Sequence, residues 1–339
     1  MTAQKSKISL KIKFSMIVMI FIAISLLIGG VGLYNLSAMK GRIARIVNTS
    51  FHKIQLVSGI NKDLLLVSRT EKDMLISEDV KEMQAYAQLI KKTEQSIQKK
   101  AKQLSQVANQ QEKKMLQDFN RAFAKFMEVH GQIRELTMDN SNFKAATLAA
   151  EKAGPLIGKL QDHVEKVLVA YEGEFEEAGQ LFDAMFLAEA GGLMNRSARL
   201  LSDIRELENK EQAIIFSRET DKTNALIQEM NQLKAPISKE FDDLGASISN
   251  KTKADFKAAR TYFDQFVTVS QEITGLAARN SNIKAFNLSQ SQGRQYLDQA
   301  EKIMADMIAA GQKGLSQDRD MADANFKKAR MLLIVMALA

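Results

Sequence analysis

FAKFMEVHGQIRELTMDNSNFKA, residues 123–145, aligns without gaps with FDQFVTVSQEITGLAARNSNIKA, residues 263–285, at a shift of 140 residues. Ten of the 23 positions are identical, whereas unrelated segments would match at about one or two. The same shift places Glu71 on Glu211 and Leu64 on Ile204, so the repeated unit is longer than one helix. We therefore infer a duplication that gives two homologous helical modules.

The apolar identities in this repeat form a narrow stripe along one helix face. In the first copy they are Phe123, Phe126, Val129, Ile133 and Leu136, separated by 3, 3, 4 and 3 residues. Such spacing is typical of helices that pack in coiled-coil-like bundles. The phenylalanines are therefore expected in a bundle core and not in a cofactor site.

The identical Asn-Ser-Asn triplets, 140–142 and 280–282, interrupt both copies of the stripe. Asn and Ser compete with the helix backbone for hydrogen bonds and favour helix caps. This preference predicts a turn between two helices, with Asn142 and Asn282 as the N-caps. A continuous helix with a polar patch is the alternative.

The composition favours long helices throughout, because the chain of 339 residues has only 2 Pro, no Trp and no Cys. The predicted helices span residues 36–77, 82–106, 110–139, 143–172, 177–217, 221–247, 251–279 and 283–330. The break at 172–176 is weakly marked, and Gly191-Gly192 offers a rival position. Eight helices, or six if both triplets are helical, return the chain to the end at which it started. The expected class is all-α, an elongated antiparallel helical bundle.

Charge and motifs exclude several classes of function. The net charge of +7 arises from 47 basic and 40 acidic residues that are mixed along the chain, which argues against nucleic-acid binding. His52, His130 and His163 are far apart and lack a second ligand at i+4, so no metal site is expected. Phosphate-binding glycine loops and nucleophile motifs are absent. We expect no enzyme activity and no cofactor.

A membrane anchor is expected at the N-terminus. Residues 14–34 are uncharged and long enough to span a bilayer, and Lys5, Lys7, Lys11 and Lys13 before them favour a cytoplasmic N-terminus. A cleaved signal peptide is the alternative, but its apolar region is normally shorter, at about 7–15 residues. The last nine residues, MLLIVMALA, follow a basic cluster and predict the start of a second span. A hydrophobic tail packed on the bundle is the alternative.

These observations predict five segments along the chain. They are a cytoplasmic N-terminus at 1–13, a transmembrane helix at 14–34, a first four-helix-bundle module at 35–175, a second tandem module at 176–330 and the start of a second transmembrane helix at 331–339.

With its short basic N-terminus, one span and helical bundle, the chain resembles the bacterial methyl-accepting chemotaxis receptors. The segment LVSRTEKDML, residues 66–75, is similar to the first helix of their four-helix sensing domains, and the duplication resembles their helical bimodular variety. The resemblance implies a sensor in the bacterial inner membrane with residues 35–330 in the periplasm. It also implies a homodimer, a small-molecule ligand or a periplasmic binding protein as partner, and coupling to a chemotaxis kinase complex.

The ligand class implied by this resemblance is a small carboxylate or an amino acid, which needs cations and oriented donors. The candidate ligand-binding residues are Arg69, Lys72, Ser68 and Thr70 in the first copy and Arg205 and Lys210 in the second. A solvated basic helix face is the alternative for each cation. Two other functions remain open: the sensor of a histidine kinase or nucleotide cyclase, and a helical tether that binds a protein partner.

Overall fold

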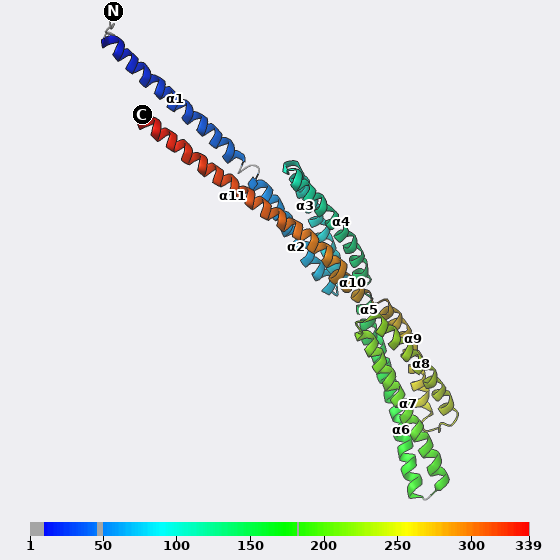
Figure 1. Ribbon diagram of the computed structural model, residues 1–339. Coiled ribbons are helices and arrows are strands. Elements are labelled where there is room, and N and C mark those ends of the chain that lie inside the picture. Colours follow the sequence, from blue (N-terminus) through cyan, green and yellow to red (C-terminus); the bar gives the residue numbers. More distant parts are fainter. Residues whose placement is uncertain (1–9, 46–49, 182, 339) are drawn as a thin grey trace, which may run out of the picture. The chain divides into compact units, whose positions relative to one another are not determined.

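The structure, a computed structural model, describes residues 10–45, 50–181 and 183–338, and α-helices joined by short connections account for nearly all of them (Figure 1). The helices are α1 (Leu10–Arg45), α2 (His52–Ile76), α3 (Val80–Val107), α4 (Gln110–Asp139), α5 (Ser141–Leu148), α6 (Gly154–Gln180), α7 (Ala184–Phe216), α8 (Thr220–Gly245), α9 (Lys253–Arg279), α10 (Ser281–Leu288) and α11 (Arg294–Leu338). Two π-helical segments, η2 (Ala149–Ala153) and η3 (Ser289–Gly293), precede α6 and α11. The predicted all-α class is confirmed.

Most predicted helix boundaries lie within a few residues of the observed ones, with one clear exception. The break expected at 172–176 is wrong, and so is the rival at Gly191-Gly192, because α6 continues to Gln180 and α7 begins at Ala184. The Asp183 side chain caps α7 by accepting hydrogen bonds from the amides of Met185 and Phe186 at 3.1 and 3.0 Å. This cap satisfies amides that have no partner inside the helix, and it fixes where α7 starts.

Helix α1 carries the N-terminal apolar segment. Over Leu10–Gly41 its mean hydropathy reaches 2.7, which makes it long and apolar enough to cross a membrane, and no residue in this range is buried. The predicted continuation of this helix through 46–49, like Lys5 and Lys7, lies outside the described residues.

The chain forms two compact units that are interleaved along the sequence. The first unit comprises Met1–Thr70, Gln88–Phe126 and Gln295–Ala339, and the second comprises Glu71–Ala87 and Met127–Arg294. The units therefore do not follow the expected sequential division at residue 175, since all of α6 belongs to the second unit.

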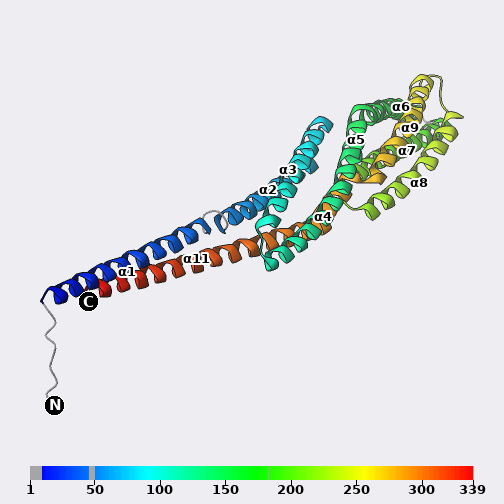
Figure 2. The same ribbon diagram turned by 90° about the horizontal axis from the view of Figure 1, so that it is seen from above.

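In the first unit, parts of α2, α3, α4 and α11 pack together, and α1 lies beside the end of α11 in both views (Figures 1 and 2). Ion pairs join α2 to its neighbours: Lys53 to Glu112 of α4 at 2.7 Å and Asp63 to Lys100 of α3 at 2.6 Å. Helix α11 approaches α2 closely at Gly311, where a Cβ atom would lie 2.9 Å from Ile54 Cγ1.

In the second unit, α6, α7, α8 and α9 form a four-helix bundle in which α6 and α8 each pack against both α7 and α9. Its core is a continuous apolar cluster that includes Leu160, Ile204, Ile237 and Phe263. Burial of these side chains is the main force that holds the bundle together.

The predicted phenylalanine stripe lies in the core. Phe123 and Phe126 are at most 5% exposed, and in the second copy Phe263 and Phe266 are at most 1% exposed. In the first copy the buried positions continue at His130, Ile133 and Thr137, so the core face also carries polar residues.

Candidate functional site

The cations predicted from the sequence do not form one buried site. Arg69, Lys72 and Arg205 are exposed, whereas Lys210 pairs with Glu229 of α8 at 2.5 Å. The hydrogen bond that the Lys210 ammonium donates to Glu229 raises the pKa of Lys210. Of the predicted hydroxyls, Ser68 is partly buried and Thr70 is buried in the core face of α2.

The Asn-Ser-Asn triplets break the helices at one residue each. Asn140 and Asn280 adopt the left-handed conformation, with φ of 49° and 50°, and α5 and α10 begin at the next residue. The expected interruption is thus present, but it is a single left-handed residue and not a loop. Asn tolerates this conformation because its side chain is short and polar.

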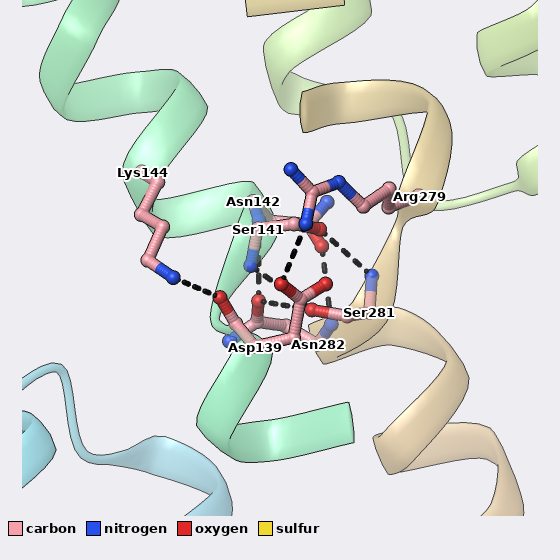
Figure 3. A network of polar contacts seen from close by, with 7 residues as sticks. All are labelled: Asp139, Ser141, Asn142, Lys144, Arg279, Ser281 and Asn282. Carbon is pink, nitrogen blue, oxygen red and sulfur yellow. Dashed lines mark hydrogen bonds and ion pairs between the residues drawn. The ribbon is translucent and has the colours of Figure 1, made fainter. Parts of the chain in front are cut away.

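The two triplets contact each other across a near-symmetric junction (Figure 3). The amides of Ser141 and Asn142 donate to Ser281 Oγ at 2.9 Å and to Asn282 Oδ1 at 3.2 Å. The reciprocal hydrogen bonds, to Ser141 Oγ and Asn142 Oδ1, are both 3.1 Å long. The prediction that Asn142 and Asn282 cap their own helices is therefore wrong: each caps the helix of the other copy.

Side-chain contacts close this junction on both sides. Asn142 Nδ2 donates to Asn280 Oδ1 and Asn282 Nδ2 to Asn140 Oδ1, both at 2.7 Å. At the rim, Arg279 pairs with Asp139 at 2.9 Å (Figure 3). Since the first two residues of each triplet are buried and the third is partly buried and hydrogen-bonded, the junction is a structural joint and not a free binding surface.

A buried polar cluster occupies the second unit near this junction. The Glu71 carboxylate lies 2.7 Å from His130 Nδ1 through one oxygen and accepts a 2.7 Å hydrogen bond from Ser289 Oγ through the other. Glu71 and His130 are only 4% exposed. Ser289 is the first residue of η3, so the cluster ties α2, α4 and the π-helical segment together.

The duplicated counterpart of Glu71 has a different environment. Glu211 on α7 is 5% exposed, and its Oε1 atom has no hydrogen-bond partner. Lys234 of α8 also buries an ammonium group without a hydrogen-bond partner. Burial raises the pKa of Glu211 to about 7, while the Lys234 charge opposes this rise and Glu208 adds to it. Burial likewise lowers the pKa of Lys234, against the attraction of Glu211.

Sequence reasoning paired Glu71 with Glu211 but did not identify either as a site. A signal was present: both glutamates occupy core positions of a heptad-like stripe, between Val67 and Met74 in one copy and between Leu207 and Ile214 in the other. A charged residue at such a position is costly unless it is paired, so it marks a place with a specific role. His130, between Phe126 and Ile133, and Lys234, between Met230 and Ile237, have the same spacing, but the sequence does not show which glutamate each of them reaches.

Taken together, the two packed bundles, the buried polar residues in their cores and the apolar N-terminal helix define an all-helical sensory module. The chain belongs to the family described as the four helix bundle sensory module for signal transduction, which matches residues 5–184.

Two individual proteins are also similar. The sensory transducer protein YvaQ of Bacillus subtilis (strain 168) is 25% identical over 146 residues, which are 43% of this chain and 26% of that protein. The chain thus spans about a quarter of the length of this curated relative. Among solved structures, the TorS sensor domain, crystallised as a complex with TorT in the presence of TMAO, has a TM-score of 0.47 and 9% identity, over 78% of this chain and 100% of that one.

Proposed function

We propose that residues 35–330 are the extracytoplasmic ligand-sensing part of a transmembrane chemotaxis receptor in the bacterial inner membrane. The observation that carries this proposal is membership of the sensory-module family over residues 5–184. The apolar helix α1 and the basic residues at its start support an anchor with the sensing bundles outside the cytoplasm. The role is that of a receptor and not of an enzyme.

Helix α11 is the proposed output element. It runs from Arg294, directly after η3, into the apolar residues 331–338, which we propose enter the same membrane as α1. A ligand moves such a helix only if it binds more tightly to one of two conformations. A homodimer and a chemotaxis kinase complex would complete the signalling path, and a periplasmic binding protein is an alternative source of the stimulus.

The proposed stimulus is a small carboxylate or an amino acid. Three of the predicted cations are exposed and remain candidates for attracting an anion to the surface: Arg69 and Lys72 on α2, and Arg205 on α7. Lys210 supports this role less well, because its ammonium already pairs with Glu229.

A thermal-shift screen of the complete chain in lipid nanodiscs tests the sensing function. The screen contains carboxylates, amino acids, peptides and pooled periplasmic binding proteins. A ligand at a hundred times its Kd stabilises the folded state by about 2.7 kcal/mol, which raises Tm by several degrees. If no component of the screen shifts Tm, direct sensing loses its support. Two double variants then test whether the predicted cations bind the ligand: Arg69→Gln with Lys72→Gln, and Arg205→Gln with Lys210→Gln.

Two other functions of the bundle make different predictions. In a histidine kinase or nucleotide cyclase, the same sensor would bind its ligand but drive a catalytic domain. In a helical tether, the chain would bind a protein partner and no small molecule. Fusion of the chain to a chemotaxis signalling domain, followed by a swimming assay with the bound ligand, separates a sensor from a tether. Identification of the output domain of the full-length protein separates a chemotaxis receptor from a kinase or a cyclase.

A further inference from the structure

The two buried glutamates of the duplication differ in how their carboxylates are satisfied. In the first copy, His130 and Ser289 occupy both oxygens of Glu71 at 2.7 Å. The shift of 140 residues replaces His130 with Ser270 and Ser289 with Ala149. An imidazole thus becomes a hydroxyl, and a hydroxyl becomes a methyl group, so the second copy lacks the side chains that satisfy the first.

Lys234, the charged residue that faces Glu211 electrostatically in the second copy, also lacks a hydrogen bond. The Lys234 ammonium interacts electrostatically with Glu211, yet no hydrogen bond joins them. Ser270 directs its hydroxyl to Met230 Sδ at 3.9 Å, which is a weak interaction. Buried acceptors and donors of opposite charge are each costly when they lack a partner.

A molecule that bridges these two groups must present a donor to the carboxylate and an acceptor to the ammonium. Above pH 7, where Glu211 is mostly ionised, a simple carboxylate would satisfy Lys234 but would be repelled by Glu211, and a simple amine would face the reverse problem. A zwitterion pairs with both groups at once, since charge-assisted hydrogen bonds form at each end.

We infer that Glu211 and Lys234 form a binding site for a small zwitterion, such as a free α-amino acid, inside the bundle of α6 to α9. The inference rests on the proposed ligand-sensing function and narrows its ligand class. In the first copy the protein fills the equivalent position with its own His130 and Ser289, so that copy is structural and the second copy is the sensor.

The bundle is open to solvent close to these residues, on the side formed by α8 and α9. A groove of about 700 Å³ lies between these helices and is lined mainly by uncharged polar side chains, including Asn231, Gln271 and Thr274. Asn231 is one turn from Lys234 on α8, and Thr274 is one turn from Ser270 on α9.

Calorimetric titration of the complete chain in nanodiscs tests the inference. The probes are glycine, L-alanine and L-serine, and the matched probes acetate and ethylamine each lack one of the two charges. We expect the amino acids to bind and the matched probes to bind at least tenfold more weakly. Glu211→Gln and Lys234→Met should each weaken amino-acid binding at least tenfold, whereas Glu206→Gln and Lys239→Met, exposed on the same two helices, should change it less than twofold.

A transplant variant guards against loss of binding through unfolding. Ala149→Ser with Ser270→His, combined with Met230→Ile to match Ile90 of the first copy, gives Glu211 the partners of Glu71. We expect this variant to keep or raise Tm while it loses amino-acid binding. Unchanged binding in the transplant and in both single variants overturns the inference but leaves ligand sensing intact, as does binding of acetate alone. Absence of every small-molecule and protein ligand overturns both.

Discussion

At the scale of the residue, two histidine–carboxylate pairs have the same distance but differ in burial. His130 lies 2.7 Å from Glu71 and His163 lies 2.7 Å from Asp255. The first pair is at most 6% exposed at its side chains, whereas the second is 24% and 36% exposed. Removing one partner of a buried pair strands the other in a poorly solvated site, but an exposed partner is solvated by water.

We therefore expect His130→Ala to lower the free energy of unfolding by about 3–5 kcal/mol. His163→Ala, the matched control, should cost about 1 kcal/mol or less for its ion pair. Urea unfolding of the two variants, followed by circular dichroism, measures both values. Equal losses would show that the Glu71 cluster contributes no more than a surface pair.

Glu211 gives stability a dependence on pH with a defined sign. Burial raises its pKa from 4.5 to about 7 in the folded chain. Between these values the folded chain keeps a proton that the unfolded chain has released, so the free energy of unfolding falls as the pH rises. The loss is about 2–3 kcal/mol between pH 5 and pH 8. Lys234, whose pKa is lowered, acts in the opposite direction at alkaline pH below 10.5.

Urea unfolding at pH 5 and pH 8 measures this dependence. Glu211→Gln should remove most of the difference between the two values, because glutamine does not titrate. Glu206→Gln, an exposed change on the same helix, should retain it. A wild-type difference that survives in Glu211→Gln would assign the pH dependence to other groups.

At the scale of the element, the left-handed asparagines allow the cost of backbone strain to be measured apart from the loss of side-chain hydrogen bonds. Asn140 has φ 49°, accepts from Asn282 and donates to the carbonyl of Glu78 at 3.3 Å. Glycine adopts this φ without a Cβ penalty, whereas alanine incurs it. Asn140→Gly should therefore destabilise by about 1–3 kcal/mol through lost hydrogen bonds. Asn140→Ala should cost about 1–2 kcal/mol more, and chemical unfolding of the two variants measures the difference.

The elements also show how far sequence reasoning reaches. The apolar period and the duplication predicted the helices, the core phenylalanines and the interruptions at the triplets, because these depend on local spacing. The crosswise capping of Asn142 and Asn282 could not be predicted, since it requires contact between residues 140 positions apart. Likewise, the spacing of glutamates predicts burial but not whether His130 or Lys234 reaches them.

At the scale of the whole molecule, the two compact units each draw on separate stretches of the chain. The sequence suggests modules in tandem, but Gln295–Ala339 belongs to the first unit and Met127–Arg294 to the second. A repeat in sequence reports ancestry and helix register, while the unit to which a helix belongs depends on which apolar faces meet in three dimensions.

The proposed topology of the receptor makes a prediction about the whole chain. Because the chain has no Cys, single cysteines report exposure without background. Gln232→Cys, exposed on α8, should react with a membrane-impermeant maleimide in intact cells or spheroplasts. Ser6→Cys, among the N-terminal lysines, should react only after the membrane is permeabilised, because positive residues near a span are retained in the cytoplasm. Ser25→Cys, within the apolar part of α1, should resist labelling in both states because hydrocarbon excludes the reagent. Protection of Gln232→Cys until permeabilisation would instead place the sensory bundles in the cytoplasm and remove the basis for extracytoplasmic sensing.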